Sequence, residues 1–424
     1  MTDTKAALRM WLTYRGVWGF VGTLSWTTAA VYFVRDVDMT PFQLVLAGTA
    51  LELAYFLFEV PTGIVADLYS RKLSIIIGAV VSGAAMIAIG ALPQVGFVIA
   101  AMAVWGFGWT FRSGAEDAWL ADEIGNDALG SAYQRGAQVA RVTGLVGIAA
   151  AVGLALVDLR LPFVVAGGTT VALAVFIAIV MSESGFTKPD RHTATHPLRV
   201  VGTTARQGVD LVRSSPILPL ILGIFFFLGA FQEGFDRLWE AHLLLEVGLP
   251  ELGPLGDVAW FGILGAATLI LSFAVAAPLV RRVEQLRAER LARLLLVLHA
   301  ILLACALAFA LAGSLLLAAT AYLATSVVRD LAGPPFQTWL NGTITDSSVR
   351  ATVLSFTSIS GSFGEWSGGL ALGAVGTRWG VRTALATGAL LLAPTLLLFT
   401  RAIRHHGMEP ELAEAHVTAL TAEP

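Results

Sequence analysis

Residues 73–92 read LSIIIGAVVSGAAMIAIGAL, twenty consecutive residues without a charged side chain. An α-helix of that length is about 30 Å long, which matches the hydrocarbon thickness of a bilayer. The stretch therefore predicts a membrane-spanning helix, and the rest of the chain can be divided by the same criterion.

The composition of the whole chain agrees with a bilayer as its solvent. Of the 424 residues, 56% are apolar and 13% are charged, and the mean hydropathy is +0.75. A water-soluble domain does not carry so few charges. The net charge of −3 argues against nucleic acid as a partner, and the single cysteine, Cys305, excludes an internal disulfide and a cysteine metal site.

Charged or Pro/Gly-bearing breaks separate twelve apolar stretches of spanning length. The predicted spans are Trp11–Val34, Pro41–Ala66, Leu73–Leu92, Val95–Ala121, Ser131–Val157, Leu161–Met181, Ile217–Val247, Leu255–Val280, Leu291–Ala312, Leu315–Asn341, Ala351–Val375 and Val381–Arg401. The sequence thus predicts an all-α membrane protein of twelve transmembrane helices in two pseudo-symmetric six-helix bundles.

The longest polar stretch divides the chain into two halves. We expect an N-terminal bundle over residues 1–183, a cytoplasmic linker over 184–216, a C-terminal bundle over 217–404 and a cytoplasmic tail over 405–424. Part of the linker places apolar residues on one helical face and arginines elsewhere, which predicts an amphipathic helix on the inner membrane surface.

The distribution of basic residues predicts the orientation. With the N-terminus inside, the cytoplasmic segments hold seventeen lysines and arginines and the outer loops hold four. Basic residues concentrate in cytoplasmic loops. Both termini are therefore expected in the cytoplasm of a cell whose plasma (inner) membrane the chain crosses many times.

Several charges remain deep inside the predicted spans, where exposure to lipid would cost several kcal/mol each. The deep arginines are Arg112, Arg141, Arg237 and Arg329. The acids that accompany them are Glu52, Glu116, Asp117, Glu233, Asp236, Glu240, Asp330 and Glu365. The charges on the fourth, seventh and tenth spans, together with Glu52 on the second, are interpreted as a proton-coupling or cavity set. Buried ion pairs also hold helices together without a transport role.

Residue spacing indicates which of these charges share a helix face. Three pairs are four residues apart, namely Arg112 with Glu116, Glu233 with Arg237, and Asp236 with Glu240. The first two can be ion pairs. The third pair consists of two acids, which raise each other's proton affinity, and a group that binds and releases protons is what a proton-coupled carrier requires.

Tryptophans near the ends of spans are explained by anchoring at the membrane interface. Four lie elsewhere and are candidate walls of a substrate cavity: Trp109, Trp119, Trp239 and Trp339.

The loop after the second span reads GIVADLYSRK and places Gly63, Asp67, Arg71 and Lys72 in the pattern GxxxDxxxRK. In this loop the sequence resembles the major facilitator superfamily, whose GxxxDRxGRR-like loop joins helices 2 and 3 on the cytoplasmic side. The resemblance implies the major facilitator fold, and it implies that these residues act as a cytoplasmic gating motif. Leu68 and Ser70 depart from the family's pattern.

The runs FEVPTG and WTFRSGAEDAWLADEI resemble the tetracycline- and macrolide-efflux-like drug:proton antiporter branch. In that branch, the arginine that Arg112 matches takes part in proton coupling. The glycine-proline signature of the antiporters is absent from residues 144–156, GLVGIAAAVGLAL. The direction of transport therefore stays open.

The leading functional hypothesis is a secondary active transporter that uses alternating access, with proton-coupled efflux of an amphipathic or cationic small molecule of the multidrug type. We expect no cofactor besides the proton gradient, no metal, a small-molecule substrate and protons as partners in a lipid bilayer, and a monomer. A proton-coupled importer or a uniporter of a small solute is the alternative.

Two hypotheses from other classes are weaker. The first is a non-transporting membrane receptor or scaffold, but the sequence shows no added soluble domain that could carry a signalling output. An enzyme would have His299 as the histidine deep in a span, but no Ser/His/Asp set, metal cluster or phosphate-binding glycine loop accompanies it. We therefore expect no enzyme, and we interpret His299 as a packed core residue.

Overall fold

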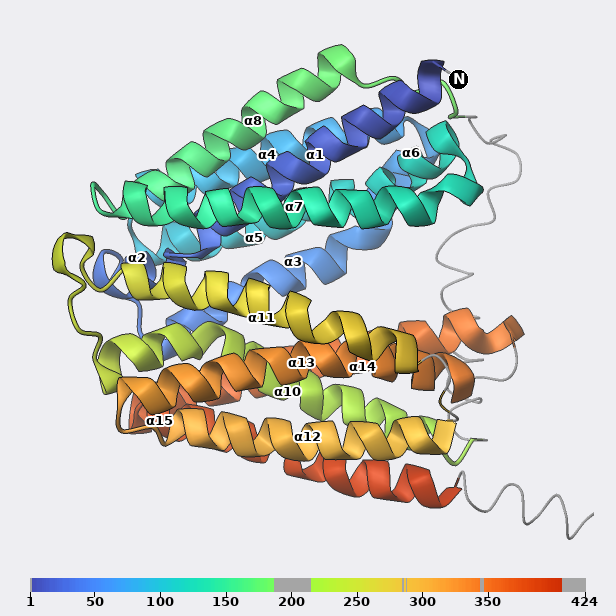
Figure 1. Cartoon of the computed structure of the whole chain (residues 1–424). Coiled ribbons are helices and arrows are strands. Elements are labelled where there is room, and N and C mark those ends of the chain that lie inside the picture. The colour runs from blue at the N-terminus through green and yellow to red at the C-terminus, as the bar shows by residue number, and fades with distance from the viewer. Residues whose placement is uncertain (1, 187–214, 284–285, 287, 344–346, 406–424) are drawn as a thin grey trace, which may run out of the picture. The chain divides into compact units, whose positions relative to one another are not determined.

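The computed structural model describes residues 2–186, 215–283, 286, 288–343 and 347–405, and its long elements are helices (Figure 1). The chain forms two compact units, Met1–Ala194 with Leu243–Ala266, and Thr195–His242 with Ala267–Pro424. The predicted amphipathic helix of the linker and the predicted tail beyond residue 405 lie outside the described residues.

The first unit is built from eight helices in chain order. They are α1 (Thr2–Trp26), α2 (Ala29–Arg35), α3 (Pro41–Leu68), α4 (Arg71–Ala91), α5 (Val95–Arg112), α6 (Ala115–Ile124), α7 (Asn126–Ala155) and α8 (Leu161–Val180). Helix α1 packs along α7, α4 lies between α5 and α8, and α3 packs on α5. A π-helix (Leu243–Val247) and a short 3₁₀-helix (Gly253–Leu255) also belong to this unit.

The second unit contains α10 (Leu218–His242), α12 (Ala288–Ala310), α13 (Leu315–Thr343), α14 (Ser347–Trp379) and α15 (Val381–Leu390). It also contains most of α11 (Ala259–Val283), whose first turns belong to the first unit. Helix α10 packs along α14, and α12 packs along α13. The last candidate span runs on from α15 to His405.

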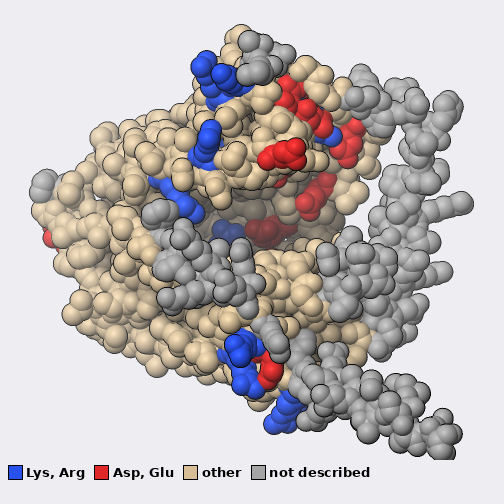
Figure 2. Space-filling view, turned by 45° about the vertical axis from the view of Figure 1, so that its right-hand side comes forward, with Lys and Arg blue, Asp and Glu red and all other residues tan. Residues whose placement is uncertain are grey.

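Ten helical segments among the described residues are long and apolar enough to cross a membrane. Helix α11 contributes a shorter apolar stretch, Ala259–Ser272, and α14 is 33 residues long but carries many serines and glycines. The surface in Figure 2 agrees with this composition, since most of the described surface on that face is uncharged. Transmembrane helices are confirmed, while the number twelve stays a prediction.

The fourth predicted span is not one continuous helix. It breaks at Ser113–Gly114, between α5 and α6, where Gly114 has φ +72°. This left-handed conformation is accessible to glycine without the steric cost that a Cβ brings. The break leaves Arg112 as the last residue of α5 and Glu116 in the first turn of α6.

Close helix contacts depend on glycine where two backbones meet. Between α4 and α8, a Cβ added at Gly83 would lie 2.8 Å from the Gly167 carbonyl oxygen, and one added at Gly167 would lie 2.5 Å from the Gly83 carbonyl oxygen. Small residues at such crossings are the usual means by which membrane helices approach closely.

Gly167→Ala is expected to destabilise the protein by about 1–3 kcal/mol, because the new methyl group must push two backbones apart. Gly168→Ala is the matched control on the same helix, since nothing lies within 4 Å of a Cβ added there. Unfolding of both variants in detergent micelles by SDS titration measures the difference. Equal stability of the two variants would contradict the close contact.

Candidate functional site

Arg112 is the buried charge of the first unit, with 3% of its surface exposed. Its guanidinium carbon lies 3.6 Å from the ring centroid of Trp18 on α1 and 3.9 Å from that of Trp109 on its own helix. Two indole faces therefore stabilise the cation where water is excluded. Trp109, a predicted cavity aromatic, is one of these two partners.

Glu116 supplies the counter-charge. Its carboxylate oxygens lie 3.7 Å from the Arg112 Nε and 3.6 Å from the Arg15 Nη1, and the Tyr14 hydroxyl donates a hydrogen bond to it. The ion pair expected from the four-residue spacing is thus present across the break at Gly114. Two arginines share one carboxylate, so this cluster carries one positive charge more than negative.

The second unit holds two ion pairs on α10. Asp236 accepts two hydrogen bonds from Arg329 of α13, with Nη1–Oδ1 and Nη2–Oδ2 distances of 2.5 and 2.8 Å. Glu233 accepts one from the Arg237 Nε at 3.0 Å. The bidentate arrangement is the strong geometry for arginine and carboxylate. It joins residues 93 positions apart, and sequence spacing gives no sign of it.

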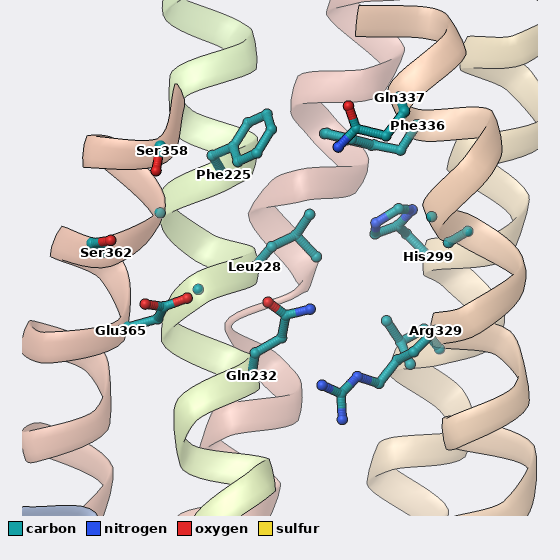
Figure 3. A pocket seen from close by; sticks show the side chains of 15 residues that line it. Phe225, Leu228, Gln232, His299, Arg329, Phe336, Gln337, Ser358, Ser362 and Glu365 are labelled. Atoms are coloured by element: carbon teal, nitrogen blue, oxygen red, sulfur yellow. The ribbon is translucent and has the colours of Figure 1, made fainter. Parts of the chain in front are cut away.

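A cavity of about 380 Å³ in the second unit is bordered by Arg329. Helices α10, α12, α13 and α14 contribute its walls, and Figure 3 shows Glu365 and Arg329 reaching into it from opposite sides with Gln232 between them in that view. Ser358 and Ser362 add hydroxyl groups on the α14 side. A pocket with both charges and several amides or hydroxyls can bind a polar solute.

His299 also borders this cavity, although it is 2% exposed. Its Nδ1 lies 2.7 Å from the Leu295 carbonyl oxygen. A carbonyl oxygen only accepts, so the Nδ1 of His299 carries the proton of this hydrogen bond. His299 is therefore buried, as predicted, and it also forms part of the cavity wall.

The two basic residues of the GxxxDxxxRK loop contact groups of their own unit. Arg71 donates to the Ala118 carbonyl oxygen and pairs with Asp122, while the Lys72 Nζ donates to the Met181 carbonyl oxygen at 2.7 Å. Asp67 is exposed, and Gly63 has open space around its Cβ position. A gating role for this loop stays a prediction.

The remaining predicted acids differ in their surroundings. Asp330 accepts a hydrogen bond from Ser272 of α11 and is exposed, although it follows Arg329 in sequence. Asp117 is exposed on α6, and Glu52 is half-buried in the middle of α3. Glu240 is half-buried one turn beyond Asp236 on α10.

Two of the four predicted cavity tryptophans are core residues. Trp119 is 2% exposed, and its Nε1 donates to the Ser182 carbonyl oxygen at 2.7 Å. Trp339 is fully buried against Phe336 and Phe399. Each of these large rings belongs to a hydrophobic core, Trp119 in the first unit and Trp339 in the second. Trp239 stacks on Tyr322, with ring centroids 4.0 Å apart.

Known proteins resemble this chain over most of its length. The Major Facilitator Superfamily profile matches residues 16–366. An uncharacterized MFS-type transporter, YxaM of Bacillus subtilis (strain 168), is 21% identical over 378 residues, which are 87% of this chain and 90% of the relative.

Solved structures share the fold at low identity. A mutant of the nucleoside transporter NupG superimposes with a TM-score of 0.74 at 11% identity, covering 95% of this chain and 99% of that one. A bacterial homolog of the human lysosomal transporter Spinster, in an inward-facing and unoccupied conformation, gives 0.70 at 14% identity, covering 95% and 97%. The peptide transporter POT in complex with sulfate gives 0.70 at 14% identity, covering 94% of each chain.

Glu116→Gln is expected to destabilise the protein by about 3 kcal/mol, because it leaves two arginines in the membrane interior without a counter-charge. The matched control is Glu289→Gln, which breaks the exposed pair with Arg293 on α12 and should cost less than about 0.5 kcal/mol. Thermal unfolding in detergent measures both. A loss for Glu116→Gln no larger than the control's would show that the cluster is not held together by this carboxylate.

Proposed function

Because this chain belongs to the major facilitator superfamily, we propose that it is a proton-coupled secondary transporter that exports a small amphipathic molecule. In this proposal it crosses the plasma membrane twelve times as two six-helix bundles, with both termini in the cytoplasm. It works as a monomer by alternating access of its two halves, and the proton gradient is its driving force.

The observation that carries the proposal is the ion pair between Asp236 and Arg329. The pair joins two different membrane-spanning helices, and Arg329 also borders the cavity that Glu365 enters from the other side. The side chain of Asp236 is 46% exposed, so the ion pair is not sealed inside the packed core of its unit. We propose that protons reach Asp236 from this exposed side.

Protonation of Asp236 removes the charge that holds Arg329. The guanidinium then needs another partner, because an unpaired cation inside the membrane is costly. Glu365 of the cavity wall, or an acceptor group on a bound solute, can become that partner. Proton binding at Asp236 thus frees Arg329 to interact with the solute, and this shared arginine couples the two events.

The export direction rests on the resemblance of residues 58–63, FEVPTG, and of residues 109–124, WTFRSGAEDAWLADEI, to drug:proton antiporters. The names of the structural neighbours mention nucleosides and peptides, so the fold accommodates different cargoes. A proton-driven flux assay separates the two directions. An antiporter accumulates solute in an acidic vesicle lumen, and a symporter accumulates it in an alkaline one.

Purified protein in liposomes is expected to accumulate ethidium or naphthalene-2-sulfonate when the lumen is made acidic. In Asp236→Asn the gradient-driven accumulation should fall by a factor of about 100 or more, whereas exchange of labelled for unlabelled probe should persist. Solute binding and helix movement do not need the lost proton site, which is why exchange is spared.

Glu289→Gln is the control, since it removes an acid from an exposed ion pair on α12 and should keep gradient-driven accumulation unchanged. Accumulation in an alkaline lumen would refute export by antiport. Equal accumulation by Asp236→Asn and the unaltered protein would refute coupling through this pair.

A further inference from the structure

A second cavity, of about 350 Å³, lies in the first unit among α1, α4, α5 and α7. Its walls include Arg112, Met86 and the four indoles of Trp18, Trp26, Trp105 and Trp109. None of the side chains that line it carries a carboxylate, an amide oxygen or a hydroxyl. The cavity is therefore walled by aromatic surface and by hydrogen-bond donors.

Several of these donors are buried without an acceptor in the described part of the chain. They are the Nε and Nη1 of Arg112 and the Nε1 of Trp18 and of Trp105. Glu116 is the ion-pair partner of Arg112, but at 3.7 Å it lies beyond hydrogen-bond distance. Buried donors without partners cost free energy, so a ligand that supplies acceptors gains what the protein alone lacks.

The guanidinium of Arg112 is placed so that its N–H edge is available to such a ligand. Trp18 and Trp109 cover it by stacking contacts at 3.6 and 3.9 Å, whereas the N–H groups lie in the plane of the guanidinium and point outward. Arg15 and Arg112 line the cavity and Glu116 pairs with both, so these three groups sum to one positive charge. Asp117 follows Glu116 in the first turn of α6 and is exposed.

We propose that this cavity is a further solute-binding site, in addition to the cavity of the second unit that Arg329 borders, and that its ligand is an organic anion with a flat aromatic body. The anionic group takes the edge of Arg112 and the indole N–H donors, and the aromatic body stacks among the tryptophans. A cationic ligand would meet two arginines, Arg15 and Arg112, and no side-chain acceptor on the cavity wall. The inference rests on the proposed transport function and names a class of substrate for it.

Three probes with the same ring system test the charge preference. They are naphthalene-2-sulfonate, the neutral naphthalene-2-sulfonamide and the cationic 2-naphthylmethylammonium, each titrated calorimetrically into the full chain in nanodiscs. The sulfonate is expected to bind at least about tenfold more tightly than the sulfonamide, and the ammonium is expected not to bind measurably.

Two variants locate the site. Arg112→Gln should weaken sulfonate binding by about tenfold or more, and Trp105→Phe, which keeps a ring but removes one donor, by about threefold or more. Trp379→Phe is the control, since this tryptophan is 61% exposed on α14. If Arg112→Gln does not fold, Trp105→Phe still tests the site.

Equal binding of the three probes, tightest binding of the ammonium, or unchanged sulfonate binding by Trp105→Phe would overturn the proposal. Failure of the anion site can be distinguished from failure of the proposed transport function. Sulfonate binding with the expected preference but without proton-driven flux would overturn the transporter and leave the anion site. Proton-driven flux of ethidium without sulfonate binding would overturn the anion site and leave the transporter.

Discussion

An ionised side chain inside a bilayer has no water to solvate it, so its position is decided by the partners that the neighbouring helices provide. In the first unit, Arg112 lies between two indole rings, with Glu116 across a helix break. In the second unit, Arg329 is held by two hydrogen bonds from its guanidinium to Asp236. A helix break at Gly114 and a cavity lie beside Arg112, and a second cavity is bordered by Arg329.

The two arginines meet the same requirement in different ways. Arg112 is almost completely buried and is stabilised mainly by aromatic faces, so its N–H edge keeps binding capacity. The guanidinium of Arg329 already donates two hydrogen bonds to Asp236, whose side chain is 46% exposed. In the mechanism that we propose, the first unit recognises the anionic end of the cargo and the second unit responds to protons.

Local spacing was enough to predict part of this arrangement. The residues of the pairs Arg112–Glu116 and Glu233–Arg237 are four apart in sequence, and both pairs are present, the first across the helix break at Gly114. The pair Asp236–Arg329 depends on the relative rotation of α10 and α13, which a single sequence does not specify. Helix rotation also explains why Trp119 and Trp339 fill cores, and why the roles of Tyr14, Gln232 and His299 were missed. Long apolar spans were predictable, because bilayer thickness fixes their length.

The coupling of solute movement to proton movement is tested most directly in vesicles that contain the pH dye pyranine. The solute that the protein transports, naphthalene-2-sulfonate or ethidium, is added outside the vesicles. No pH gradient is imposed beforehand, and valinomycin with potassium holds the membrane potential constant. Antiport predicts that the lumen becomes alkaline as the solute enters, and that vesicles without protein show no such change. Entry of the solute through the protein at constant lumenal pH would contradict proton coupling.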